Sequence, residues 1–149
     1  MSTTALAARS VLLAAALLAA GCSMNPMGTY APTFSARLTG TSEVPPNPSA
    51  GTGTLEARLN TDSRLLKWKV SYAGLTGPVT AAHFHGPAAP GTNAGVVVPF
   101  TGALESPVTG EATLTSAQVT DLMAGKWYVN LHTAAHPGGE IRGQVILNN

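Results

Sequence analysis

The chain has 149 residues, a length that fits one domain, with eight basic and seven acidic side chains. Charged residues make up only 10% of the sequence and form no basic run, which argues against a nucleic-acid partner and against electrostatic membrane binding. Cys22 is the one cysteine, so a disulfide within the chain is excluded.

The first 21 residues are typical of an export signal. Arg9 precedes an apolar run at residues 11–20, which is too short to span a bilayer and fits the apolar region of a secretory signal. The segment LAAGC that ends at Cys22 resembles the bacterial lipobox, although Ala19 stands where that pattern prefers leucine. The resemblance implies cleavage before Cys22 and acylation of this residue. The alternative is ordinary signal-peptidase cleavage, which would leave a free thiol.

A lipid on Cys22 would hold the exported protein at a membrane. Several acyl chains anchor a protein durably, whereas a single chain binds only marginally. Ser23 follows the cysteine where a retention signal would place aspartate, and similarity to bacterial lipoproteins then implies the outer membrane of the cell envelope. Residues 22–33 are expected to be a tether, and residues 34–149 the folded domain.

From residue 34 onward, short segments of alternating apolar and polar residues are separated by glycine- and proline-rich turns. Leu66, Trp68 and Val70 fall on one face of the clearest segment, as in a half-buried strand. The alternation predicts strands at residues 34–38, 54–59, 64–72, 79–85, 95–100, 110–114, 126–132 and 140–147. We therefore expect an all-β domain, an immunoglobulin-like or Greek-key β-sandwich.

One segment departs from this pattern. Residues 116–124 carry three apolar residues at helical spacing, with Ser116 in the N-cap position and Gly125 where a C′ glycine belongs. We expect one short helix between two strands.

All four histidines lie in two short motifs, one with His83 and His85 and the other with His132 and His136. Residues i and i+2 of a strand share a face, so His83 and His85 can reach one ion through metal–nitrogen bonds of about 2.0–2.1 Å. His132 ends a predicted strand, and the following loop can fold His136 back over it. The motifs predict a four-histidine metal site, in which all four rings bind the ion or three bind it and the fourth lies beside them. The alternative is that the histidines hydrogen-bond loop carbonyls.

Four imidazoles without a thiolate favour copper, with zinc as the alternative ion. Asn130, Glu140 and Arg142 flank the second motif and are candidates for the groups that surround the ligands. Glu140 could accept the second N–H of a ligating histidine and fix its tautomer. It could instead form a surface ion pair with Arg142.

Several motifs in the same order resemble the CHRD domain, the module named after chordin. They are LTG at 38–40, EVPP at 43–46, HFHGPA at 83–88, WYVNLHT at 127–133 and GGEIRGQ at 138–144. The resemblance covers nearly all of the expected domain and implies an exported protein. In chordin the domain belongs to an extracellular binding protein, so the family does not itself imply a chemistry.

A weaker resemblance is to copper-zinc superoxide dismutase, a β-sandwich in which a His-x-His strand end binds copper. His83 and His85 match that pair, and His132 or His136 could stand for a further ligand. The resemblance suggests for Arg142 the task of guiding an anion to the metal. The chain departs from that family because it has no zinc-binding loop of histidine and aspartate and no disulfide.

Three functions are compatible with the sequence. The favoured one is a metal-binding module that stores or delivers copper, or protects against it, in the cell envelope. The second is a superoxide dismutase-like redox enzyme, which only the histidines support. The third is a metal-free module that binds a protein partner the sequence does not identify. No Ser-His-Asp, paired-carboxylate or phosphate-loop arrangement is visible, so other enzymes are disfavoured.

Overall fold

The computed structural model describes residues 31–149, whose strands form one antiparallel sheet. The strand order is β5-β4-β7-β8-β1-β2-β3-β6, and β9 pairs with β1. The elements are β1 (Thr33–Thr39), the 3₁₀ turn η1 (Gly40–Ser42), β2 (Thr52–Asn60), β3 (Leu65–Ala73), β4 (Val79–His85), β5 (Val96–Pro99), β6 (Val108–Thr113), α1 (Ser116–Met123), β7 (Tyr128–Thr133), β8 (Ile141–Gln144) and β9 (Ile146–Leu147). The all-β class with one short α-helix is therefore confirmed.

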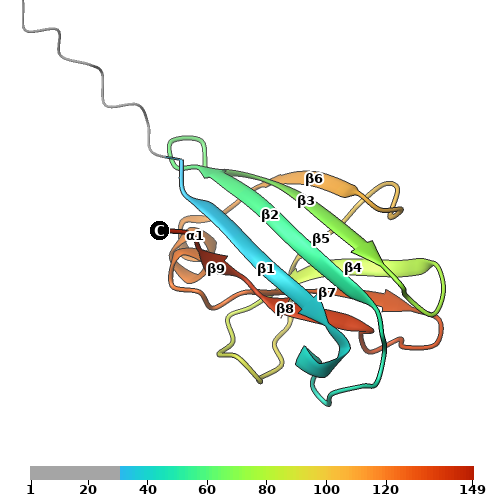
Figure 1. Ribbon diagram of the computed structural model, residues 1–149. Helices are drawn as coiled ribbons and strands as arrows, with labels where there is room; N and C mark the ends of the chain where they lie inside the picture. The colour runs from blue at the N-terminus through green and yellow to red at the C-terminus, as the bar shows by residue number, and fades with distance from the viewer. Residues whose placement is uncertain (1–30) are drawn as a thin grey trace, which may run out of the picture.

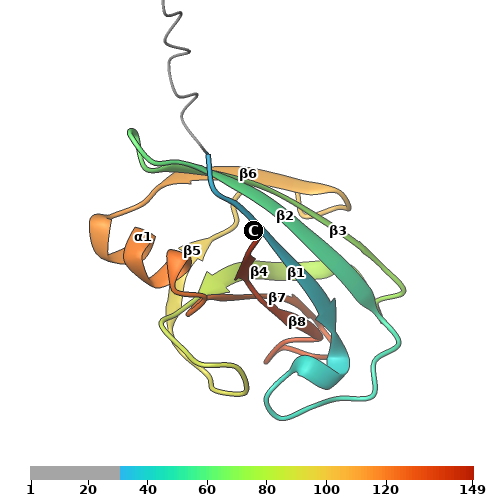
Figure 2. The same cartoon turned by 60° about the vertical axis from the view of Figure 1, so that its left-hand side comes forward.

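The sheet bends over on itself into two layers, with β1, β2, β3 and β6 in one and β5, β4, β7 and β8 in the other (Figures 1 and 2). β8 continues the sheet into β1 through one register pair, Thr39 with Arg142. The hydrophobic core lies between the layers, where Leu55, Leu66 and Phe84 are at most 1% exposed. The two layers of the expected sandwich thus belong to one continuous sheet.

The buried positions alternate along β2 and β3, as expected of strands with one face in the core and one in solvent. β7 differs, because all six of its residues are buried. Val129 and Leu131 belong to the core. Asn130 and His132, which point to the opposite face, are buried by the loops that cover the outside of this layer.

The short helix α1 begins with a capping box. Thr115 Oγ1 accepts a hydrogen bond from Gln118 N at 3.2 Å, and Gln118 Oε1 accepts one from Thr115 N at 2.8 Å. The N-cap is therefore Thr115 and not Ser116, which lies in the first turn. Gly125 follows the helix with a φ of 69°, in the left-handed conformation predicted for the C′ position.

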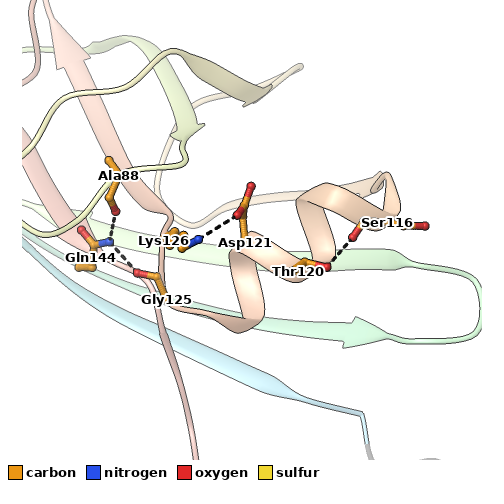
Figure 3. Close-up of polar contacts among 7 residues, drawn as sticks. All are labelled: Ala88, Ser116, Thr120, Asp121, Gly125, Lys126 and Gln144. Carbon is orange, nitrogen blue, oxygen red and sulfur yellow. Dashed lines mark hydrogen bonds and ion pairs between the residues drawn. The ribbon is translucent and has the colours of Figure 1, made fainter.

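Gln144 at the end of β8 ties three segments together (Figure 3). Its Nε2 donates to Ala88 O at 3.1 Å and to Gly125 O at 2.8 Å, which joins β8 to the loop after β4 and to the end of α1. Nearby, Lys126 pairs with Asp121 at 3.6 Å. The loop that follows β4 is thereby fixed at its start against the outer face of β7 and β8.

No helix within residues 31–149 is long and apolar enough to cross a membrane. The expected export signal, the lipid on Cys22 and most of the expected tether fall on residues 1–30, outside the described residues, and stay predictions.

Replacing Gly110 by alanine should lower the free energy of unfolding by about 1–3 kcal/mol. A Cβ at Gly110 would overlap the Trp68 ring, which packs at 5.2 Å from Phe84 and 4.9 Å from Phe100 between ring centroids and has little room to shift. Urea unfolding measures the effect. Gly77→Ala is the matched control, because nothing lies within 4 Å of its added Cβ; equal losses in the two variants would contradict the packing argument.

Candidate metal centre

The two histidine motifs meet on the outer face of β4 and β7. His83 on β4 is the register partner of Asn130 on β7, and His85 is the partner of Tyr128. His132 lies two residues beyond Asn130 and therefore on the same face. The pairing of β4 with β7 thus places three histidines around Asn130.

One ring nitrogen of each of His83, His85 and His132 lies within 4.8 Å of the other two. His83 Nδ1 and His132 Nε2 are 3.2 Å apart. Two nitrogens that each bind one ion at about 2.0–2.1 Å, with about 90–110° between the bonds, lie about 2.9–3.4 Å from each other. This pair therefore already has the separation of two ligands on one metal ion.

In the rings of His85 and His132, a backbone carbonyl determines which nitrogen carries the lone pair. His132 Nδ1 lies 2.9 Å from Pro137 O, and His85 Nδ1 lies 3.0 Å from Ala94 O. A carbonyl only accepts, so each Nδ1 donates its hydrogen and the lone pair remains on Nε2. His85 Nε2 is buried without a hydrogen-bond partner. Ligating histidines usually donate their second N–H in this way, so both rings are oriented as metal ligands.

The surroundings keep two of the rings neutral. Burial, together with the nearby His132 and His85, lowers the pKa of His83. Burial also lowers the pKa of His85, outweighing the hydrogen bond to Ala94 O. Because only neutral imidazole binds a metal ion, these shifts favour ligation at neutral pH.

His136 does not join the group formed by the other three histidines, so the structure brings together three of the four expected ligands. The backbone of His136 closes the turn after β7: its N–H donates to Thr133 O at 3.1 Å, and its carbonyl accepts from Gly139 N at 3.0 Å. His136 lines a surface hollow with residues 43–47 and 135–139, and its ring nitrogens do not lie within the 4.8 Å spacing that the three clustered rings share. The loop folds back, as expected, but not onto His132.

The sequence model of the CHRD domain matches residues 34–145, most of the chain. The chain belongs to the CHRD domain family. No curated protein and no solved structure matches it. The resemblance to CHRD domains is therefore confirmed, whereas the one to superoxide dismutase remains a likeness of the His-x-His motif alone.

Glu140 of this CHRD domain is fully buried and has a different environment from the one expected. Its Oε1 accepts from Ser49 Oγ at 2.7 Å and Thr76 N at 2.8 Å, and its Oε2 accepts from Thr76 Oγ1 at 2.7 Å and Thr133 Oγ1 at 2.6 Å. Burial acts to raise the pKa of Glu140, but these four hydrogen bonds lower it to about 2. Glu140 therefore fastens loops together. Neither the expected hydrogen bond to a histidine nor the surface ion pair with Arg142 is present among residues 31–149.

Arg142 supports the site through Tyr128. Its Cζ lies 3.5 Å from the centroid of the Tyr128 ring, and this ring stacks on His85 with centroids 4.7 Å apart. Nη1 donates to Asn93 Oδ1 at 2.8 Å and Nη2 to Thr92 O at 2.7 Å. The hydrogen bonds of Arg142 hold the loop beside His85. Because the side chain is only 2% exposed, it is not placed to guide an anion to the metal.

Sequence reasoning missed three contributors to the CHRD site, namely Tyr128 and the carbonyls of Ala94 and Pro137. Tyr128 shares a strand face with Asn130 and His132, and that alternation is a signal that could have identified it. The two carbonyls depend on loop conformation, for which the side-chain pattern carries no signal.

Proposed function

We propose that this CHRD protein is exported, anchored to the cell envelope by a lipid on Cys22, and binds one copper ion through His83, His85 and His132. The observation that supports the proposal most strongly is the convergence of three imidazoles, two of which have their lone pairs directed by backbone carbonyls. The bound ion would be stored, delivered to another protein, or kept from harmful reactions.

Copper is favoured over zinc by the donor set. The group has three imidazole nitrogens and no thiolate or carboxylate. Nitrogen sites bind Cu(II) more tightly than the other divalent first-row ions, and structural zinc sites usually contain thiolates. A copper-holding module is also favoured over a superoxide dismutase-like enzyme, because the guanidinium of Arg142 is buried and already donates to Asn93 and Thr92.

The proposal is tested by titrating the purified protein with Cu(II) and, separately, with Zn(II). We expect one copper ion per chain, bound more tightly than micromolar, and weaker binding of zinc. A superoxide-decay assay on the copper-loaded protein then distinguishes a copper-holding module from a superoxide dismutase-like enzyme. We expect that the protein does not accelerate the decay of superoxide. Failure to bind either ion at micromolar concentration overturns the metal proposal. Loss of fatty-acid labelling in a Cys22→Ser variant tests the anchor independently.

Copper affinity should stay constant as the pH falls from 8 toward the ordinary histidine pKa of about 6.5 and decline only below it. Protonation of a ring blocks ligation, and the lowered pKa values of His83 and His85 keep these rings neutral to a more acidic pH than ordinary histidines. Titrations at a series of pH values measure this. A decline that begins above pH 7 would contradict the account.

A further inference from the structure

Asn130 lies at the centre of the histidine group. It is only 3% exposed, it is the register partner of His83, and its Oδ1 is 3.0 Å from His132 Nε2. Two of the three histidines, His83 and His132, are therefore neighbours of this side chain.

The contact between Asn130 and His132 brings two acceptors together. His132 Nδ1 donates its hydrogen to Pro137 O, which leaves a lone pair on Nε2. The Asn130 amide nitrogen faces the carboxyl group of Glu43, and both groups lie against Gly139, so Oδ1 is the atom turned to His132. An amide oxygen and an imidazole lone pair at 3.0 Å repel each other, so the contact requires either a second proton on the His132 ring or a metal ion that both atoms bind.

A third atom, the Nδ1 nitrogen of His83, also lies next to His132 Nε2. His83 Nδ1 lies 3.2 Å from the same His132 Nε2. A ligand oxygen at about 2.0–2.2 Å and a ligand nitrogen at about 2.0–2.1 Å, at a right angle around one ion, are about 3 Å apart. The oxygen of Asn130 and the nitrogen of His83 thus each lie at the distance of a neighbouring ligand from His132 Nε2.

We infer that Asn130 Oδ1 is the fourth ligand of the metal site, which completes a set of three imidazole nitrogens and one amide oxygen. The inference rests on the proposed function. A mixed nitrogen and oxygen set in a tetragonal arrangement suits Cu(II), whereas Cu(I) prefers soft sulfur ligands. Asn130 therefore selects the divalent state of the bound copper.

The test combines copper affinity with electron paramagnetic resonance spectra of the Cu(II)-loaded protein. We expect a wild-type spectrum of a three-nitrogen, one-oxygen site. Asn130→Leu should shift the copper hyperfine splitting and lower the affinity about 10–100-fold. Asn130→Asp keeps an oxygen in place and adds a negative charge, so it should bind Cu(II) at least as tightly as the wild type. His136→Ala is the control and should change neither quantity.

The outcomes distinguish the two proposals. A wild-type protein that binds no copper overturns both. A wild-type protein that binds copper, with an Asn130→Leu variant of unchanged affinity and spectrum, overturns the assignment of Asn130 and leaves the three-histidine site intact. If Asn130→Leu fails to fold, the Asn130→Asp spectrum decides: a carboxylate ligand changes the copper hyperfine splitting, and an unchanged splitting rules out an oxygen ligand at this residue.

Discussion

Replacing His132 by alanine should weaken Cu(II) binding by more than about 100-fold. His132 contributes Nε2 as a ligand, and its Nδ1 is held at 2.9 Å by Pro137 O, so the variant loses a ligand whose orientation is already set. Loss of a group that merely supports a ligand costs about 10–100-fold in metal affinity, and loss of an imidazole ligand, a stronger donor for copper than an amide oxygen, should exceed this. Competition against a chromophoric copper chelator measures the affinity. His83→Ala should behave in the same way.

His136→Ala provides the matched control for this prediction. It removes the same kind of side chain four residues further along the chain, but its ring lies outside the group formed by the other three histidines. We expect its affinity to remain within about twofold of the wild type, because a surface-loop substitution away from the ligands changes little. Similar losses in His136→Ala and His132→Ala would contradict the three-histidine site and revive the four-histidine one.

Replacing Glu140 by alanine should lower the free energy of unfolding by roughly 1–3 kcal/mol for each buried donor that is left without an acceptor. The variant would leave the N–H of Thr76 and the hydroxyls of Ser49 and Thr133 without their acceptor. Urea unfolding measures the loss. Glu56→Ala, on the exposed face of β2, is the control and should stay within about 0.5 kcal/mol of the wild type.

Low pH should weaken the hydrogen bonds that Glu140 accepts and thereby lower the stability of the fold. The folded-state pKa of Glu140, about 2, lies below the ordinary value for glutamate, so the ionised carboxylate stabilises the fold at pH above that ordinary value. This contribution is lost as the pH falls toward 2. The wild type should therefore lose stability between pH 5 and pH 2 more steeply than Glu140→Gln, and equal slopes in the two proteins would contradict the role assigned to Glu140.

Side-chain alternation predicted most of the fold. The strand expected at residues 79–85 is β4, Val79–His85, with the same bounds. The single strand expected at residues 140–147 is instead two short ones, β8 and β9, separated at Val145. Val145 N donates to Trp127 O at 2.9 Å, whereas β9 pairs with β1 at Phe34 and Ser35. Alternation describes faces and not partners, so it could not show this change of neighbour.

The candidate site was predictable where it depends on spacing along one strand. The i, i+2 pair of His83 and His85 is local and follows from strand geometry. Their approach to His132 requires β4 to pair with β7, which no local pattern specifies. The position of His136 could not be predicted, because the turn after β7 is set by backbone hydrogen bonds. The hydrogen bonds of Glu140 could not be predicted, because part of its surroundings comes from loops far away in the sequence.

The most direct test of the account is anomalous diffraction at the copper edge from crystals of the copper-loaded protein. We predict one peak on the outer face of β4 and β7, about 2.0–2.1 Å from His83 Nδ1, His85 Nε2 and His132 Nε2. A peak at His136 or at another surface group, with none between these three rings, would contradict the metal centre derived from the structure.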